Sequence, residues 1–168
     1  YLESSRRIMR GFPDIKALPT VAIAGFPNVG KSTLLGKLSL SKPEIAEYAF
    51  TTKKVNTGYI EQGLKKIQLI DTPGTLARDK MNYMEKQAYL AIKYLANVMV
   101  YVFDPTYTYP FEDQVKLLEI LRQESKPIIL YMSKTDIADK ASINLIKKKY
   151  SDIITDYKEL KIKLMQQL

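Results

Sequence analysis

The chain has 168 residues, which suits one domain, and 46% of them are hydrophobic, which is enough to bury a full core. It contains no cysteine and no histidine, so disulfides, thiolate metal sites and histidine acid–base chemistry are excluded. The net charge of +8 is typical of a protein with an anionic partner such as nucleic acid, or of a lysine-rich solvated surface. No apolar stretch is long enough for a membrane helix, so we expect no membrane partner and an intracellular, cytoplasmic protein.

Residues 1–19 are expected to be a lead-in to the main domain, either a linker or the end of a helix. Gly11 and Pro13 break this segment, and Pro19 precedes the first apolar run. The chain begins without Met, and its first residues do not resemble a signal peptide. We therefore expect a piece of a longer protein, in which residues 20–168 form one domain.

A strand, a glycine loop and a helix are expected to open this domain. Residues 21–24 are apolar and β-branched, as in a buried strand, and residues 33–38 can form a helix. Between them, residues 25–32 read GFPNVGKS, the phosphate-binding pattern of two glycines followed by Lys and Ser. In this pattern the loop N–H groups surround phosphates, Lys31 reaches the β- and γ-phosphates, and Ser32 binds Mg²⁺. The pattern predicts that the phosphates are bound by Asn28, Val29, Gly30, Lys31, Ser32 and Thr33. The alternative is a chance glycine turn before a helix.

The next segment is predicted to be a loop and a hairpin. Residues 41–53 are polar and are expected to form the loop, in which the Thr52 hydroxyl would complete the Mg²⁺ shell. A pair of threonines at a strand entry is the alternative. Residues 54–61 and 65–70 alternate as the two strands of an antiparallel hairpin.

The run Asp71-Thr72-Pro73-Gly74 follows the hairpin directly. A carboxylate at this strand end, opposite the phosphate loop, can hold Mg²⁺ through water, which makes Asp71 a metal candidate. Gly74 can bring its N–H against a γ-phosphate. An ordinary turn is the alternative interpretation.

The rest of the chain alternates strands with helices. The apolar runs 98–103 and 127–132 are typical of parallel strands covered on both faces. Apolar residues at helical spacing predict the helices 81–96, 112–124, one near 143–150 and 157–168. This order predicts an α/β fold with a doubly wound, mostly parallel sheet and one antiparallel hairpin strand.

Ser133, Lys134 and Asp136 follow the last of these strands. A carboxylate here accepts two hydrogen bonds from the N1–H and the exocyclic amine of guanine, and adenine offers no such pair of donors. The stem of Lys134 can cover the base. The alternative is a helix N-cap formed by Ser or Asp.

Together, the runs at 25–32 (GFPNVGKS), 48–53 (YAFTTK) and 71–74 (DTPG) resemble the loops of the translation-factor-class GTPases, specifically the Obg-related group. Within that group the chain most resembles the nucleolar GTP-binding protein family of large ribosomal subunit assembly, which has archaeal members. The run at 6–15 resembles the link from that family's N-terminal helical domain, and the likeness extends over residues 6–136.

The resemblance implies a P-loop, Ras-like G domain that binds GTP or GDP with Mg²⁺ and hydrolyses GTP slowly until a partner accelerates it. The implied partner is a pre-ribosomal particle or rRNA, and we expect a monomer, nucleolar if the cell is eukaryotic. In resembling potassium-activated GTPases an Asn at the place of Asn28 helps to hold K⁺; a loop-capping Asn is the alternative. The implied catalytic residues are Lys31, Thr52 and Gly74, and the implied Mg²⁺ ligands are Ser32, Thr52 and Asp71.

The chain departs from the family pattern in three places. Ser133 stands where the family has Asn, so we expect guanine discrimination to weaken by ~1 kcal/mol for a lost neutral hydrogen bond. Thr75 stands where Ras-like proteins place a water-orienting Gln and this family usually has an apolar residue. No Ser-Ala-Lys or Ser-Ala-Leu loop occurs near residue 155, where residues 152–154 are either a remnant of a sixth strand or the sign of a missing loop. The alternatives are a non-catalytic GTP- or GDP-binding scaffold, an ATP-using P-loop enzyme and another Obg-like translation or stress GTPase.

Overall fold

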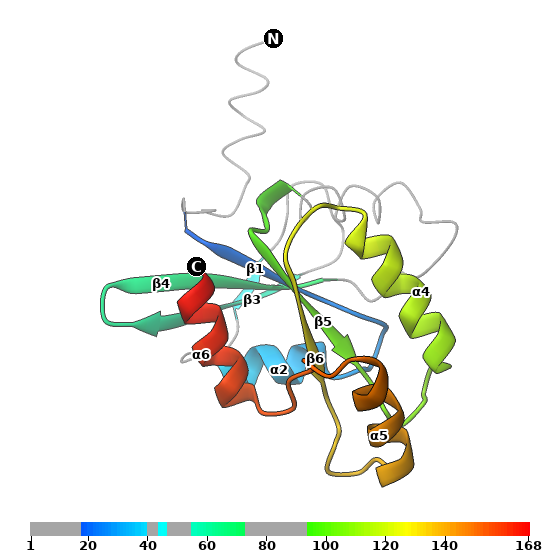
Figure 1. Cartoon of the computed structure of the whole chain (residues 1–168). Helices are drawn as coiled ribbons and strands as arrows, with labels where there is room; N and C mark the ends of the chain where they lie inside the picture. The colour runs from blue at the N-terminus through cyan, green and yellow to red at the C-terminus, as the bar shows by residue number, and fades with distance from the viewer. Residues whose placement is uncertain (1–17, 40–43, 47–54, 73–93) are drawn as a thin grey trace.

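The structure of the chain, a computed structural model, describes four stretches of sequence: residues 18–39, 44–46, 55–72 and 94–168. One sheet of six strands, in the order β2-β3-β4-β1-β5-β6, carries helices on both faces (Figure 1). Its parallel strands are largely apolar because strands covered on both faces meet little water. The doubly wound, mostly parallel α/β fold is thereby confirmed, with the parallel strands β1 (Thr20–Ala24), β4 (Lys65–Asp71), β5 (Val98–Phe103) and β6 (Ile128–Met132).

The antiparallel part of the sheet lies beyond β4. β3 (Val55–Gln62) forms the predicted hairpin with β4, and the chain turns at Gly63, whose φ of 59° is left-handed as a tight turn requires. β2 (Glu44–Ala46) pairs antiparallel with β3. The prediction of a loop over 41–53 is therefore wrong for these three residues. The open edge of β3 supplies backbone hydrogen-bonding partners there, and no local sequence pattern indicates them.

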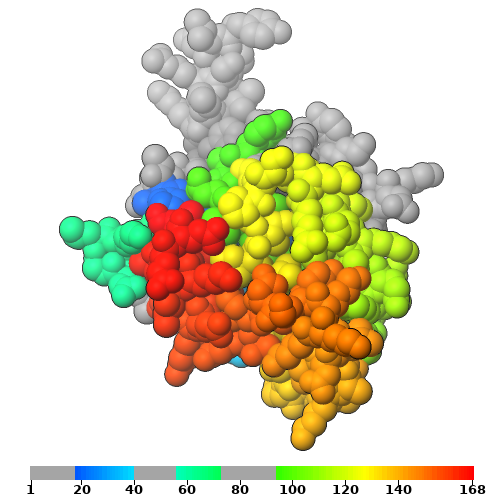
Figure 2. Space-filling view, viewed as in Figure 1, coloured from blue at the N-terminus to red at the C-terminus, as the bar shows by residue number. Residues whose placement is uncertain are grey.

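Of the helices that the structure describes in full, two lie on each face of the sheet. Helices α2 and α6 contact each other on one face, and α4 and α5 lie on the other (Figure 1). Figure 2 shows α6, in red, and α5, in orange, on the lower part of the face that it presents. The predicted helix over 81–96 lies outside the described residues except for its C-terminal end. The other predicted helices are confirmed with slightly shifted ends: α2 (Lys31–Leu38), α4 (Phe111–Arg122), α5 (Lys140–Lys149) and α6 (Tyr157–Gln167).

The face of β5 toward α4 and α5 is aromatic. The ring centroids of Tyr101 and Phe103 lie 4.9 Å apart in an edge arrangement, and Phe103 lies 5.2 Å from Tyr150 and 5.9 Å from Phe111. Both β5 rings are fully buried. This cluster fixes α4 against the sheet and with it the loop between β5 and α4, which carries Asp104.

A single residue extends the sheet beyond β6. Ile154 forms an isolated parallel bridge with Tyr131, in which the Met132 N–H donates to the Ile154 oxygen at 2.8 Å and the Ile154 N–H donates to the Leu130 oxygen at 3.0 Å. Of the residues 152–154 interpreted as a possible strand remnant, Ile154 is thus shown to pair with the sheet. The chain enters α6 at Tyr157, directly after this bridge.

The described residues do not test the predicted domain boundary. The boundary predicted between residues 1–19 and 20–168 stays a prediction, because residues 1–17 lie outside the described part. None of the described helices combines the length and the apolar character needed to cross a bilayer.

Candidate nucleotide-binding site

The loop between β1 and α2 has the backbone shape that its glycine pattern predicts. Three of its residues have positive φ: Gly25 at 148°, Asn28 at 60° and Gly30 at 98°. A Cβ on Gly25 would lie 2.8 Å from the backbone oxygen of Val102, so no larger residue fits there without a shift. Gly30 leads directly into α2, so the loop lies at the positive end of a helix, where an anion is stabilised.

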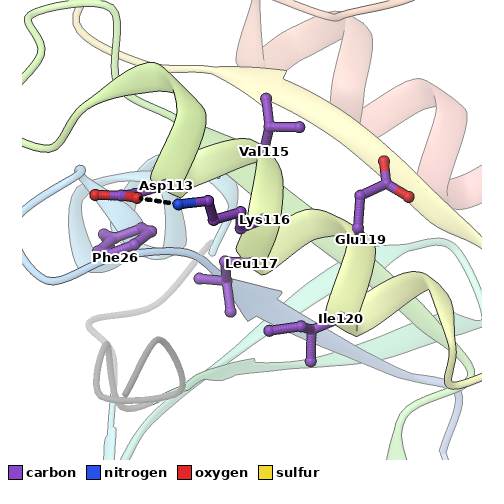
Figure 3. A pocket seen from close by; sticks show the side chains of 7 residues that line it. All are labelled: Phe26, Asp113, Val115, Lys116, Leu117, Glu119 and Ile120. Carbon is purple, nitrogen blue, oxygen red and sulfur yellow. Dashed lines mark hydrogen bonds and ion pairs between the residues drawn. The ribbon is translucent and has the colours of Figure 1, made fainter. Parts of the chain in front are cut away.

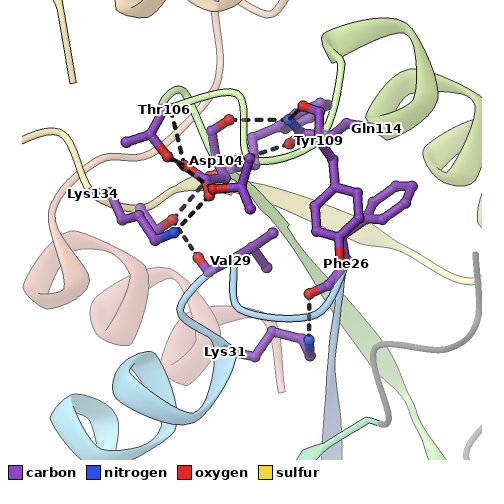
Figure 4. A network of polar contacts seen from close by, with 11 residues as sticks. Phe26, Val29, Lys31, Asp104, Thr106, Tyr109, Gln114 and Lys134 are labelled. Carbon is purple, nitrogen blue, oxygen red and sulfur yellow. Dashed lines mark hydrogen bonds and ion pairs between the residues drawn. The ribbon is translucent and has the colours of Figure 1, made fainter.

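Lys31 is the first residue of α2 and folds back over this loop (Figure 4). Its ammonium donates to the carbonyl oxygen of Phe26 at 2.6 Å, and the residue is only 7% exposed. Burial lowers the pKa of Lys31, and the carboxylate of Asp71 partly offsets that effect. The lysine therefore places a poorly hydrated positive charge inside the loop, where a phosphate can replace the carbonyl oxygen.

Ser32, the residue after Lys31, contacts Asp71 at the end of β4. The Ser32 hydroxyl donates to Oδ2 of Asp71 at 2.5 Å, and the Asn56 amide donates to the same oxygen at 3.5 Å. The pairing of β4 with β1 sets this contact, because it places Asp71 beside Ile23 just before the loop. Oδ1 of Asp71 is buried and has no hydrogen-bond partner among the described residues. A hydroxyl and an unpartnered carboxylate oxygen at this distance are the ligand types that Mg²⁺ prefers.

Three predicted residues cannot be placed in this geometry. Thr52, Gly74 and Thr75 lie outside the described residues. Their assignment to Mg²⁺, the γ-phosphate and the attacking water stays a prediction.

A pocket of about 240 Å³ joins the phosphate loop to the end of β6. Its walls unite the two predicted parts of the site, although these are about a hundred residues apart in sequence. The alternative in which Ser133 or Asp136 caps a helix is wrong, since α5 is capped by Asp139, which accepts from the Ser142 N–H at 2.8 Å. The lining residues are Gly30, Thr33, Leu34, Lys37, Tyr131, Ser133, Lys134, Asp136 and Ile137.

Ser133 ties the base side of this pocket to the phosphate loop. Its hydroxyl lies 2.5 Å from the carbonyl oxygen of Val29 and 3.1 Å from that of Phe103, and the residue is 8% exposed. A Cβ on Gly30 would make an ordinary contact with that of Ser133 at 3.4 Å, and glycine is favoured there by its left-handed φ of 98°. Although Ser is shorter than the Asn of the family pattern, it reaches the loop. The expected weakening of guanine discrimination stays a prediction.

Residues 20–134, more than half of the chain, match the family model described as 50S ribosome-binding GTPase. The chain belongs to this GTPase family. An uncharacterized protein of Methanocaldococcus jannaschii is 42% identical over 148 residues, which are 85% of this chain and 41% of that protein. Nucleolar GTP-binding protein 1 of Drosophila melanogaster is 37% identical over 144 residues, 82% of this chain and 22% of that protein. The chain therefore spans less than half the length of these two relatives.

A solved structure of similar extent supports the same assignment. The G domain of the T. maritima FeoB iron transporter is 31% identical and superposes with a TM-score of 0.70, covering 89% of this chain and 98% of that one. The predicted resemblance to GTP-binding proteins of the nucleolar GTP-binding protein group is confirmed. This is a GTP-binding domain of the GTPase class.

A buried ion pair holds Lys134 in the GTPase domain (Figure 4). The Lys134 ammonium lies 2.7 Å from Oδ2 of Asp104, whose side chain is fully buried, and Lys134 takes a left-handed φ of 51°. Oδ1 of Asp104 accepts from the Thr106 N–H at 2.9 Å and the Thr106 hydroxyl at 2.6 Å. Burial alone would raise the pKa of Asp104, but the hydrogen bonds from Lys134 and Thr106 outweigh it and lower the pKa. The pair therefore fixes the Lys134 stem at the pocket wall.

Gln114 of α4 extends this network to the phosphate loop. Its side-chain amide accepts from the Asp104 N–H at 2.9 Å and donates to the carbonyl oxygens of Asp104 and Tyr109, both at 3.0 Å. The Tyr109 ring packs on the ring of Phe26 with 4.4 Å between centroids. Base-side and phosphate-side residues are thus linked through the loop after β5.

A second pocket of about 600 Å³ lies between Phe26 and the outer side of α4 (Figure 3). Its polar side chains include Asp113 and Lys116, which pair with each other at 3.2 Å, and Glu119. Among the described residues, no group of three acidic, histidine or cysteine side chains gathers to hold a metal. This pocket offers no chemistry comparable to the nucleotide site.

Several pocket residues were missed by the motifs. Leu34 and Lys37 follow Gly30 and Thr33 at helical spacing, so the same face of α2 carries all four. Tyr131 precedes Ser133 by two positions on β6 and therefore shares its face of the strand. Leu34, Lys37 and Tyr131 could therefore have been predicted from the helical and strand periodicities, counted from the motif residues Gly30, Thr33 and Ser133.

Proposed function

We propose that this GTPase domain is a molecular switch in large ribosomal subunit assembly, which binds GTP and GDP with Mg²⁺ and hydrolyses GTP slowly by itself. The observation that carries the proposal is the single pocket in which Gly30 and Thr33 of the phosphate side meet Lys134 and Asp136. A guanine nucleotide needs both ends at once, an anion site for its phosphates and an acceptor for its N1–H and amine.

On the phosphate side, the groups supply positioned positive charge rather than a nucleophile or a base. Lys31 would turn from the Phe26 oxygen to the β- and γ-phosphates. Ser32 and Asp71 would hold Mg²⁺, and they fit it because both present oxygen and one Asp71 oxygen is buried without a described partner. When bound, Mg²⁺ neutralises phosphate charge as it develops during transfer.

The switch itself would depend on the loops on either side of the hairpin. Thr52 and Gly74 contact the γ-phosphate only in the GTP state under this proposal. Loss of that phosphate releases the segments that carry Thr52 and Gly74, and a partner that binds them meets two different surfaces.

Slow hydrolysis follows from the absence of a water-orienting residue in the sequence. Thr75 stands at the position where Ras-like proteins place a Gln. Without such a group we expect an intrinsic rate of about 10⁻⁴ to 10⁻² s⁻¹, as in other switch GTPases, and acceleration by a partner. A non-catalytic scaffold is the rival, and multiple-turnover phosphate release separates the two.

The proposed ribosomal partner is supported by the names of the matched family and relatives and by the net charge of the chain. The matched family is described as 50S ribosome-binding, and one relative is named nucleolar GTP-binding protein 1. The net charge of +8 favours an anionic partner such as a pre-ribosomal particle or rRNA. We propose that the particle is the accelerating partner. A role as another Obg-like translation or stress GTPase is the alternative.

Potassium activation through Asn28 stays a separate proposal. This residue has the left-handed φ of 60° that Asn tolerates, which fits a loop-capping role equally well. Equal hydrolysis rates in K⁺ and Na⁺ would remove potassium from the proposal.

The test begins with titration of GDP and GTP against ADP and ATP in the presence of Mg²⁺. We expect the wild-type domain to prefer guanine nucleotides strongly. Asp136→Asn should weaken GDP binding and favour xanthosine diphosphate, whose C2 carbonyl accepts a hydrogen bond from the new amide. Phosphate release is then followed over many turnovers, with and without large-subunit particles. Equal binding of guanine and adenine nucleotides would contradict the base assignment, and a rate unchanged by the particles would contradict the ribosomal switch.

A further inference from the structure

Tyr131 is a buried tyrosine of β6 in the wall of the nucleotide pocket. The residue is 6% exposed and lines the pocket beside Ser133 and Lys134. Among the described residues its hydroxyl has no hydrogen-bond partner, yet it is not one of the side-chain atoms sealed from solvent. The hydroxyl is therefore at least partly accessible, and because the residue lines the pocket, a ligand there can take the place of water.

The phenol is held in its donor form. Burial raises the pKa of Tyr131, and the Asp156 carboxylate raises it further. Asp156 itself is engaged at the start of α6, where it accepts from the Lys158 N–H at 2.9 Å. The Tyr131 proton thus remains available at every pH at which the domain is expected to work.

The other polar groups of the pocket wall are less free to serve the base. The Ser133 hydroxyl is shared by two backbone oxygens, and the Lys134 ammonium is paired with Asp104. Lys37 is exposed and lies over the Tyr157 ring at 5.9 Å. Among the described residues that line the pocket, Tyr131 is therefore a buried one whose hydroxyl donor is not used by another side chain or backbone group.

The connection between the strand remnant and α6 is short and begins beside Tyr131. Ile154 pairs with Tyr131, and only Thr155 and Asp156 lie between it and the helix. Neither of these two residues lines the pocket. The donors among the described lining residues therefore come from α2, from β6 and from the residues directly after β6.

Guanine presents three groups in a row on its Watson–Crick edge: the amine, N1–H and O6. The first two are donors that suit the carboxylate of Asp136, and O6 is an acceptor that needs a donor. We propose that Tyr131 is a specificity-determining residue whose hydroxyl donates to O6 of the bound guanine. This inference rests on the proposed guanine-nucleotide function. Asp136 rejects adenine, and Tyr131 adds affinity for guanine.

The experiment compares the wild-type chain with Tyr131→Phe, which removes one oxygen and keeps the ring. Affinities are measured by titration with GDP, with IDP, which keeps O6 and the N1–H but lacks the amine, and with 2-aminopurine riboside diphosphate, which keeps the amine but lacks O6 and the N1–H. We expect Tyr131→Phe to weaken GDP and IDP by about tenfold each, the effect of one lost hydrogen bond. The analogue without O6 should bind both chains equally.

Tyr150→Phe is the matched control, because the Tyr150 hydroxyl likewise has no partner among the described residues, but it is sealed from solvent and the residue does not line the pocket. It should leave all three affinities unchanged. Unchanged GDP binding in Tyr131→Phe, or an equal loss for the analogue without O6, would overturn the inference alone. A wild-type chain that does not prefer GDP to ADP would overturn the proposed function, and the inference with it.

Discussion

The phosphate loop and the base side of the pocket meet at Ser133, but contacts of different range hold them. On the phosphate side, Lys31 donates to Phe26, five residues earlier in the chain. On the base side, Ser133 contacts Val29 across 104 residues, and Lys134 pairs with Asp104 across 30. The Lys31 contact depends on the local backbone of the loop, and the two base-side contacts exist only once β1, β5 and β6 are side by side.

The two regions should therefore respond differently to mutation. A side chain of the phosphate loop acts mainly on the ligand, because the loop shape depends on backbone conformation and the following helix. A side chain on the base side acts on the ligand and on the fold together, because it also joins strands. A phosphate-loop mutation should change nucleotide affinity without changing the free energy of unfolding. A base-side mutation should change both quantities.

The largest effect is expected from Lys31→Met on the phosphate side. Methionine keeps a long stem but removes the charge-assisted hydrogen bonds to phosphate, so affinity for GTP should fall by about 100-fold. Because the native lysine is buried and its pKa is lowered by that burial, the free energy of unfolding of the nucleotide-free domain should change by less than about 1 kcal/mol. Nucleotide titration and urea unfolding measure the two quantities.

Lys147→Met is the control for this change, since Lys147 is an exposed lysine of α5. It should alter neither quantity. An unfolded Lys31→Met domain would show that the phosphate loop is not independent of its lysine, and the contrast between the two regions would fail.

This contrast also explains what could be predicted from sequence. The loop at 25–32, the strand 98–103 and the order of strands and helices depend on local patterns, and the structure confirms them. The reach of Ser133 to Val29 depends on the distance between two strand ends, which no local pattern contains. β2 is likewise too short to give a signal and depends on the edge of β3.

The ion pair on the base side was missed for a related reason. Asp104 ends an apolar strand, which by itself indicates only a strand end, and its partner Lys134 comes 30 residues later. The register of β5 with β6 brings the two together, since Phe103 lies opposite Met132. A parallel pairing had to be known before this contact could be predicted.

Asp104→Asn should have the second largest effect, and it should act on stability. Removing one partner of a buried ion pair costs several kcal/mol, and because the Lys134 side chain is 25% exposed we expect the lower figure of about 2 kcal/mol at neutral pH. GDP affinity should fall as well, since Lys134 loses its anchor at the pocket wall. Urea unfolding and GDP titration on the same samples check both effects.

The pH dependence sharpens this prediction. The folded-state pKa of Asp104 lies below its ordinary value of 3.8, so its contribution to stability is fully present above that value. It is lost as the pH falls through the folded-state pKa, so the difference between wild type and Asp104→Asn should shrink in acid. Asp113→Asn, which breaks a solvent-exposed pair with Lys116, should show no such difference. A wild-type advantage that grows in acid would contradict the assignment.

The smallest effect is expected from Ser133, where the two regions meet. Ser133→Ala leaves the Phe103 oxygen bonded to the Ser133 backbone N–H at 3.0 Å, so only the Val29 oxygen loses its partner. The loss should be about 1 kcal/mol of unfolding free energy and about fivefold in GDP affinity. Ser133→Asn restores a side-chain donor and should recover most of the affinity. If Ser133→Ala lost as much affinity as Lys31→Met, the phosphate loop would depend on this brace and the two regions would be one unit. If it lost neither affinity nor stability, the contact with Val29 would not join them at all.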